Sequence, residues 1–123
     1  MLTDGRGRPL AMSLTGGQEA DCRQAACLLS GHLRPGRKVL ADRAYDTNEL
    51  HWLLQREGCQ MVVPSKRGRI LPRNHDKQAY KGRNVIERLF RTMKENRAIA
   101  TRYDKRAFTY FSTCCLIACL LWL

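Results

Sequence analysis

The feature that most constrains the fold of this chain is a segment with two helical stripes, residues 76–97. One stripe consists of four polar residues at gaps of three, four and seven: Tyr80, Arg83, Glu87 and Lys94. At about 100° per residue, these side chains fall within roughly 60° of one another on an α-helix. The apolar residues occupy a different sector: Val85, Ile86, Leu89, Phe90 and Met93. The pattern predicts one long helix, weakened near its start by Gly82, that buries one side and presents an acid among bases beside it.

The rest of the chain predicts strands alternating with helices. Expected strands are Pro9 to Thr15, Lys38 to Ala41 and Gln60 to Pro64, and expected helices are Glu19 to Leu33, Asp46 to about Gln55, and a last one from near Lys105. Asp46 with Glu49 three residues later forms the pattern of a capping box, and Gly58 follows as a helix stop. This order predicts an α/β fold with a parallel component in its sheet.

Two acidic residues are candidates for chemistry, and each also has a structural interpretation. Asp42 follows an expected buried strand, and functional side chains gather at the carboxyl ends of parallel strands. It could equally be a loop-starting or capping aspartate. Glu87 has Arg83 and Arg91 four residues away on either side, so it could form an exposed ion pair on the helix.

The charge of the chain suggests a polyanionic partner. The 123 residues include 22 Lys and Arg against 11 Asp and Glu, a formal charge of +11. Basic side chains that neutralise phosphates release counterions and so favour nucleic-acid binding. Four of them lie in a loop with Pro and Gly, Ser65 to Asn74: Lys66, Arg67, Arg69 and Arg73.

The joint pattern resembles a known family. Tyr80-x2-Arg83-x3-Glu87-x6-Lys94 matches, in residues and gaps, the Y-R-E-K signature of DDE transposases of bacterial insertion sequences. Asp42-Arg43-Ala44-Tyr45-Asp46 resembles the D-x-G-Y-D segment of that group, with Ala44 in place of the usual glycine. Supporting matches are Gly7 to Leu10 (G-x-P-L), Thr15 to Gln18 (T-x-G-Q) and Ile99 to Lys105, so the resemblance extends over nearly the whole chain.

The resemblance implies a partial RNase H-like α/β fold, with a mixed sheet and flanking helices, that cuts and joins DNA with divalent metal ions. By this mapping, Asp42 and Glu87 are the second and third of three carboxylates that bind two Mg²⁺ ions. One ion activates a water or a DNA 3′-hydroxyl, and the other stabilises the leaving oxygen. Tyr80, Arg83 and Lys94 would hold phosphate or a displaced base near the transposon end. Arg91 and the basic loop residues are further DNA-binding candidates.

The same mapping predicts that residues 1–123 form the C-terminal part of the catalytic domain. The first aspartate of the family lies on an earlier strand, and Asp4 falls at the position of a non-catalytic acid. The N-terminal DNA-recognition region is also expected to be absent. Whether this chain is itself an enzyme is therefore uncertain. We expect it to be inactive alone and to need the N-terminal half of the transposase as a partner. The chain could be a truncated copy of a transposase or the second reading frame of an element that needs frameshifting, and both explanations remain open. Whether it forms a homo-oligomer is also open.

Two other functions compete with this interpretation. The chain could be a noncatalytic DNA-binding or regulatory remnant of a transposase, which needs only the basic loop and helix face. It could also be a small basic membrane-associated protein, because Phe108 to Leu123 is strongly apolar. That segment is shorter than the ~18 to 20 residues of a membrane helix and contains four hydroxyl side chains, so a buried terminal helix is expected. The absence of a signal-peptide pattern at Met1 predicts a cytoplasmic protein.

Overall fold

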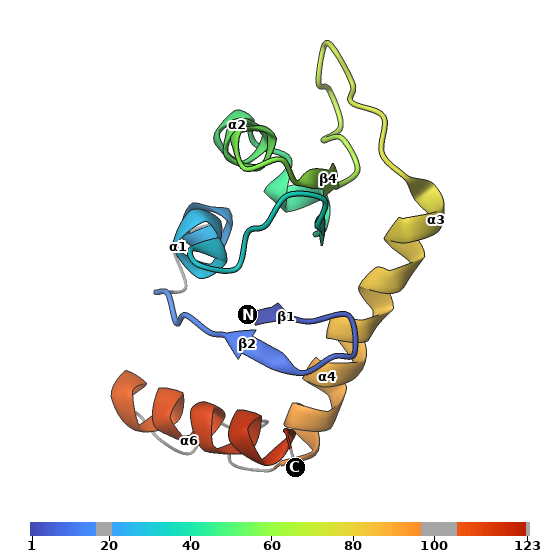
Figure 1. The fold of residues 1–123 in the computed structure, drawn as a ribbon. Coiled ribbons are helices and arrows are strands. Elements are labelled where there is room, and N and C mark those ends of the chain that lie inside the picture. The colour runs from blue at the N-terminus through green and yellow to red at the C-terminus, as the bar shows by residue number, and fades with distance from the viewer. Residues whose placement is uncertain (17–20, 97–105, 123) are drawn as a thin grey trace. The chain divides into compact units, whose positions relative to one another are not determined.

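The computed structural model describes residues 1–16, 21–96 and 106–122 (Figure 1). The chain divides into two compact units. Unit 1 contains Met1–Gly16 and Asn84–Leu123, and unit 2 contains Gly17–Arg83. Each unit has its own small sheet and its own buried side chains.

Unit 2 is built around two parallel strands. Strand β3 (Lys38–Leu40) pairs with β4 (Gln60–Val62), and α2 (Asn48–Arg56) lies between them in sequence. The 3-10 turn η1 (Asp21–Gln24) and α1 (Ala25–Leu29) precede β3, and the 3-10 turn η2 (Arg43–Tyr45) follows it. The unit ends with α3 (Lys77–Tyr80) and the 3-10 turn η3 (Lys81–Arg83). The predicted parallel pairing is therefore confirmed.

The core of unit 2 follows from helical and strand periodicity. Leu50 and Leu54 lie one turn apart on α2 and are buried, with Leu54 fully enclosed like Val62 of β4. The remaining buried apolar residues are Ala25, Leu29, Cys59 and Val63. Gly58 ends α2 with a φ of 71°, in the left-handed region that suits a glycine after a helix, as predicted.

Unit 1 combines a small antiparallel sheet with two helices. Strand β1 (Leu2–Thr3) pairs with β2 (Pro9–Ala11), and the two helices are α4 (Asn84–Glu95) and α6 (Ala107–Leu120). Met1 and Met12, which flank the strands, pack against the core formed by these helices. The core joins Leu89 and Met93 of α4 to Cys114 of α6. Partly buried apolar residues surround it: Met1, Met12, Tyr110, Ile117 and Leu121. The Nε1–H of Trp122 donates to the Pro9 carbonyl at 2.8 Å and so ties the end of this unit to β2.

Several predicted elements differ from the observed ones. The helix expected to end at Leu33 ends at Leu29, and its expected start at Glu19 lies outside the described residues, as do Arg97 and Lys105. The segment from Asp76 to Glu95 is not one continuous α-helix, because η3 separates α3 from α4 at Gly82. A helix interior disfavours glycine, which explains the position of this break.

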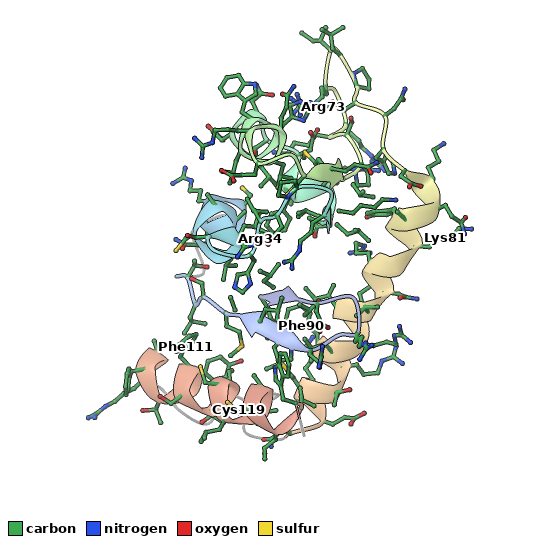
Figure 2. The ribbon with its side chains drawn as sticks, viewed as in Figure 1. Arg34, Arg73, Lys81, Phe90, Phe111 and Cys119 are labelled. Carbon is green, nitrogen blue, oxygen red and sulfur yellow. The ribbon has the colours of Figure 1, made fainter. Side chains whose placement is uncertain are left out.

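The fold class is confirmed only as α/β, because the sheets differ from the prediction. A single mixed sheet was expected, whereas the described strands form one antiparallel and one parallel pair. Helix α6 is also less buried than expected: Cys114 and Ala118 are buried, but Phe108 and Leu116 are largely exposed. Figure 2 shows the side chains of α4 and α6, including Phe90 and Cys119. Within the described ranges, no helix has the length and apolar character needed to cross a membrane.

Candidate catalytic and DNA-binding residues

Asp42 lies at the carboxyl end of the parallel strand β3, where the sequence predicts a functional side chain. Its Oδ1 accepts a hydrogen bond of 2.9 Å from the Ala44 N–H and so caps the 3-10 turn η2. The residue is exposed to solvent. The capping and functional interpretations are thus compatible, because the cap fixes the carboxylate at an accessible strand end.

Glu87 lies on α4 in unit 1, with Arg91 and Lys94 on the same helix. All three residues are exposed, while Leu89 and Met93 turn into the core of the unit. Glu87 and Lys94 are seven residues apart, about two turns, and so lie on similar faces of α4. The apolar stripe is only partly buried, because Phe90 is 42% exposed.

Tyr80 and Arg83 are the two signature residues of unit 2, and their side chains interact. The Arg83 Cζ lies 5.5 Å from the centre of the Tyr80 ring, within cation–π range. His75 meets the same ring edge-on, with ring centres 5.4 Å apart. Tyr80 is therefore held between a base and an imidazole and remains partly exposed.

Asp76 fixes the helix that carries Tyr80. Its Oδ1 accepts from the Gln78 and Ala79 N–H groups at 3.1 and 3.0 Å, so it caps α3. Its Oδ2 pairs with the Lys38 ammonium at 3.1 Å. The hydrogen bond from Ala79, followed by Lys38, lowers the pKa of Asp76. These contacts link the start of β3 to the start of α3 within unit 2.

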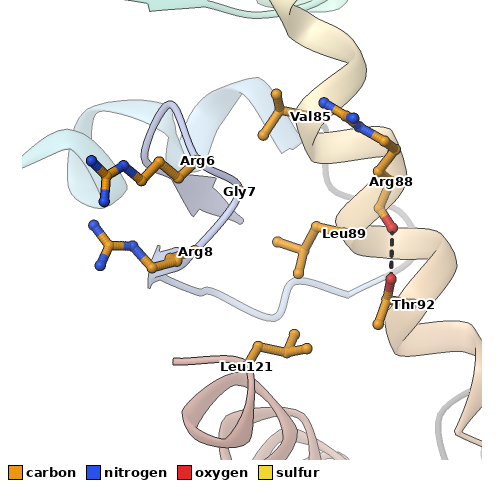
Figure 3. Close-up of a pocket in the computed structure, with 8 residues that line it drawn as sticks. All are labelled: Arg6, Gly7, Arg8, Val85, Arg88, Leu89, Thr92 and Leu121. Carbon is orange, nitrogen blue, oxygen red and sulfur yellow. Dashed lines mark hydrogen bonds between the residues drawn. The ribbon is translucent and has the colours of Figure 1, made fainter. Parts of the chain in front are cut away.

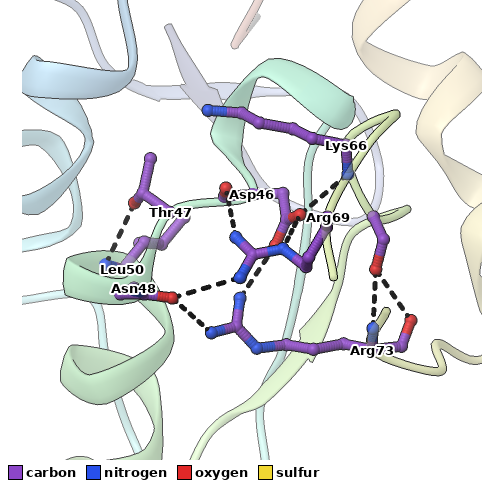
Figure 4. Close-up of polar contacts among 8 residues, drawn as sticks. Asp46, Thr47, Asn48, Leu50, Lys66, Arg69 and Arg73 are labelled. Atoms are coloured by element: carbon purple, nitrogen blue, oxygen red, sulfur yellow. Dashed lines mark hydrogen bonds and ion pairs between the residues drawn. The ribbon is translucent and has the colours of Figure 1, made fainter. Parts of the chain in front are cut away.

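Asp46 is the best-anchored acid of the chain, and the capping role predicted for it is wrong. Thr47 caps α2 instead, accepting from the Leu50 N–H at 3.2 Å. Asp46 is 1% exposed and binds the basic loop (Figure 4). Its Oδ2 accepts from Arg69 Nε at 2.7 Å and from the Lys66 N–H at 2.8 Å, and its Oδ1 accepts from Arg73 Nη1 at 2.8 Å. We call this arrangement of Asp46, Arg69 and Arg73 the clasp.

Further hydrogen bonds close the clasp. The Asn48 side-chain oxygen accepts from Arg69 Nη1 at 3.2 Å and Arg73 Nη2 at 2.7 Å. The Arg73 N–H donates to Ser65 Oγ at 2.7 Å. Burial alone would raise the pKa of Asp46, but the Lys66 N–H and the two guanidinium groups outweigh it and lower that pKa. Asp46 is therefore a structural anion and not an open metal ligand.

The four predicted basic loop residues divide into two pairs. Arg69 and Arg73 are engaged by Asp46, with side chains only 20% and 25% exposed. Lys66 and Arg67 are exposed. Sequence spacing could not distinguish the pairs, because Asp46 is 23 residues from Arg69 and 27 from Arg73.

An open pocket of about 330 Å³ in unit 1 is lined by three arginines that sequence reasoning did not select (Figure 3). Arg6 and Arg8 extend from the turn between β1 and β2, and Arg88 lies on α4. The only sequence signal is the Gly-Arg-Gly-Arg run at residues 5–8. The pocket is therefore a basic surface in addition to the predicted one.

Two features fix the turn that carries Arg6 and Arg8. Gly7 has a φ of 87°, and a Cβ at this position would lie 3.1 Å from Val85 Cγ1, so a glycine lets the turn approach α4 closely. Asp4 accepts from the Arg6 and Arg8 N–H groups at 2.9 Å and pairs with the Arg8 guanidinium at 2.7 Å. Although burial alone would raise the pKa of Asp4, its hydrogen bonds with Arg8 lower it. Asp4 is thus committed to the turn.

The Arg8 guanidinium is also held from a second side. Its Cζ lies 4.3 Å from the centre of the Trp122 ring, a cation–π contact. The indole is itself hydrogen-bonded to Pro9. Arg8 is therefore ordered before any ligand binds.

The donor chemistry of Asp42 and Glu87 fits the metal implied by the resemblance. Both offer exposed carboxylate oxygens, which Mg²⁺ prefers. The described part of the chain contains no group of three His, Cys, Asp or Glu that could by itself hold an ion.

Comparison with known proteins identifies the family. Residues 1–122 match the family model "Transposase DDE domain". The chain is 33% identical to the "Putative transposase for insertion sequence element IS6501" of Brucella ovis, over 99% of this chain and 94% of that protein. It is 31% identical to the "Putative transposase for insertion sequence element IS402" of Burkholderia cepacia, over 95% of this chain and 60% of that protein.

No solved structure matches the fold. The family match nevertheless extends over nearly the whole chain, and both relatives carry the names of insertion-sequence transposases. The resemblance drawn from the Y-R-E-K residues is confirmed. The chain therefore belongs to the transposase DDE domain family.

Proposed function

We propose that this chain is the C-terminal part of an RNase H-like transposase catalytic domain that supplies two of its three carboxylates. The observation that carries the proposal is Asp42, an exposed carboxylate at the carboxyl end of β3 in a chain of this family. Glu87, exposed on α4 within the Y-R-E-K spacing, would be the other carboxylate. The residue that completes the set would come from an N-terminal half, and the chain alone would be inactive.

Asp42 and Glu87 would hold Mg²⁺, which supplies Lewis-acid activation of a water or 3′-hydroxyl and neutralises charge on the leaving oxygen. The hydrogen bond from the Ala44 N–H orients the Asp42 carboxylate. Its role is therefore to offer a preoriented anionic oxygen at the strand end. That orientation matters because phosphoryl transfer depends strongly on alignment of the reacting groups.

The basic residues would bind the DNA backbone around these acids. Arg83 and Lys94 offer a guanidinium fork and a point charge to phosphate, and Tyr80 offers a partly exposed ring to a base. Arg91, Lys66 and Arg67 are exposed and would add phosphate contacts. Arg69 and Arg73 would contribute mainly by holding the basic loop, since Asp46 engages both. We also propose action in the cytoplasm, with a homo-oligomer as one possible assembly.

The pocket arginines of unit 1 are further candidates for DNA binding. Arg6, Arg8 and Arg88 line one open depression, and within the described residues Arg8 alone of the three pairs with an acid. Guanidinium groups are suited to phosphate, because each offers a fork of N–H donors to its oxygens. We therefore propose that these three arginines also contact the DNA backbone.

Reconstitution with an N-terminal half tests the proposal. The 123-residue chain should not cleave transposon ends with Mg²⁺, whereas the chain joined to the region that carries the first aspartate should. Glu87→Gln and Asp42→Asn should each abolish that activity. Asn caps helices about as well as Asp, so Asp42→Asn preserves the turn and removes the charge.

The matched control is Glu95→Gln, which removes an exposed acid from the same helix α4. It should leave cleavage unchanged. An active fusion that tolerates Glu87→Gln would refute the role of Glu87, and cleavage by the unfused chain would show that this chain completes its own site.

A noncatalytic DNA-binding remnant is the second candidate. The observation that favours it is that Lys66 and Arg67 are exposed and three arginines line the pocket of unit 1, which DNA binding can use without a metal ion. DNA binding that persists while every reconstituted fusion stays inactive would support this alternative.

A further inference from the structure

The tip of the basic loop exposes two large apolar side chains. Ile70 is 94% exposed, the most of any large hydrophobic residue among those described, and Leu71 is 81% exposed. Pro72, which follows them, is also exposed. Two adjacent aliphatic side chains in water are unfavourable, since removing apolar surface from water is a favourable process. The tip therefore has the properties of a surface that another molecule covers.

The tip is exposed but held from both sides. Arg69 directly precedes it and Arg73 directly follows it, and both pair with the buried Asp46 (Figure 4). The Ser65 hydroxyl closes the base of the loop by bonding to the Arg73 backbone. Only residues 70–72 lie between the two anchored arginines. The clasp thus presents a short, preorganised apolar bridge, which lowers the entropy cost of binding.

The surroundings of the tip indicate an anionic partner. Residues 65–74 contain four basic and no acidic side chains. Asp46 engages two of the four, and Lys66 and Arg67 remain exposed beside the tip. A protein partner for an apolar tip does not require this charge, whereas a DNA duplex combines outer phosphates with an apolar base stack. Inserted Ile, Leu and Pro side chains unstack base steps in proteins that bend DNA.

We propose that Ile70 and Leu71 form a wedge that inserts between stacked bases while Lys66 and Arg67 bind the flanking phosphates. The inference rests on the proposed function, because it takes DNA as the partner. It adds a role that the carboxylates and the Y-R-E-K residues do not supply, namely local distortion of the duplex. Asp46 is then a positioning residue, since it holds the wedge without touching DNA.

A wedge predicts a preference for DNA whose stacking is already weakened. The test compares binding of the full chain to an intact duplex and to the same duplex with a single-nucleotide gap, by fluorescence anisotropy at one fixed salt concentration. The gapped duplex should bind about fivefold tighter or more, because the gap removes much of the unstacking cost. In a double variant, Ile70→Ser with Leu71→Ser, this preference should fall to near unity while binding to the intact duplex persists through the basic residues.

Two further variants make the comparison specific. Leu116→Ser with Leu120→Ser removes two aliphatic side chains of α6 that are 68% and 64% exposed, and it should retain the full preference for the gap. Asp46→Asn should reduce the preference although Lys66, Arg67 and both tip side chains are unchanged. Circular dichroism on each variant checks that the fold is retained.

The outcomes separate the wedge from the proposed function. Salt-dependent binding without a preference for the gap, or a preference that survives in the tip variant, overturns the wedge and leaves the proposed function standing. Association of the chain with itself or another protein that is lost in the tip variant, with no effect on DNA, also overturns it. Failure of the wild-type chain to bind either duplex refutes both.

Discussion

The Asp46 carboxylate and the Arg73 guanidinium form a 2.8 Å ion pair that spans 27 residues of sequence. With Arg69 at 2.7 Å, this contact fastens the basic loop to the segment that follows Asp42. One buried acid therefore connects a candidate catalytic strand end to a candidate DNA-binding loop. Removing the Asp46 carboxylate should therefore both lower the stability of the protein and release the basic loop.

Asp46→Asn should destabilise the protein by about 2 to 4 kcal/mol. Removing one partner of a buried ion pair costs about 3 to 5 kcal/mol, and the partial exposure of both arginines reduces that figure. Urea unfolding followed by circular dichroism measures the change. Trypsin should also cut faster after Arg67 and Arg69 once the loop is released. Asp4→Asn is the control, since its partner Arg8 is 40% exposed and a loss below about 1 kcal/mol is expected.

Stability should fall in acid because Asp46 has a lowered pKa in the folded state. The unfolded chain takes up a proton near the ordinary value of 3.8, before the folded chain does. The contribution of Asp46 is therefore complete well above that value and is lost as pH falls through the lower folded pKa. Asp4 and Asp76, whose pKa values are also lowered, should add to the same trend.

The measurement for this prediction is the unfolding free energy at a series of pH values between neutral and strongly acidic. Asp46→Asn should show a shallower decline than the wild type. Parallel curves for the two proteins would contradict the assignment of the acid-sensitive group to Asp46.

Gly7→Ala should destabilise unit 1 by about 1 to 2 kcal/mol or more. A non-glycine residue in the left-handed region costs about that much, and the new Cβ would also press on Val85 Cγ1. Thermal unfolding measures the loss. Gly5→Ala, in the same turn but with no atom within 4 Å of the added Cβ and no positive φ, should have little effect. Adding Val85→Ala to Gly7→Ala should relieve the steric part only, so full recovery would argue against backbone strain.

Lys66→Ala with Arg67→Ala should weaken DNA binding and make it less dependent on salt. Each lost phosphate contact should reduce the slope of log K against log salt by about 1. Folding should be unaffected, because both side chains are exposed to solvent. Arg69→Ala with Arg73→Ala should instead lower stability as well, since it removes both partners of Asp46. Equal losses of stability in the two double variants would contradict the division of the basic loop residues into an exposed pair and a pair that belongs to the clasp.

Arg6→Ala with Arg88→Ala tests the pocket of unit 1 separately. Both side chains line the open depression, and neither forms a described ion pair. Their loss should reduce the salt slope of DNA binding by up to about 2 at nearly constant stability. Duplex-binding isotherms at several salt concentrations measure this slope, and an unchanged slope would show that the pocket arginines do not contact DNA.

The sequence alone determined the elements whose signals are local. The cap pattern near Asp46 and the stop at Gly58 located α2, apolar residues at helical spacing located α4, and short apolar runs located β3 and β4, because each signal is carried by residues close together in the sequence. The spacing of Tyr80, Arg83, Glu87 and Lys94 also identified the family. Gly58 marked the end of α2, whereas Gly82 was predicted only to weaken the long helix that the structure divides into α3 and α4.

Which charged residues form buried ion pairs became apparent from the three-dimensional structure alone. Asp46 matches a helix cap in sequence, yet Thr47 takes that role and Asp46 binds arginines more than 20 residues away. Likewise, four loop bases that look equivalent divide into two that are buried against an anion and two that face solvent. The pairing of charges depends on distances in space and on burial, which spacing along the chain does not specify.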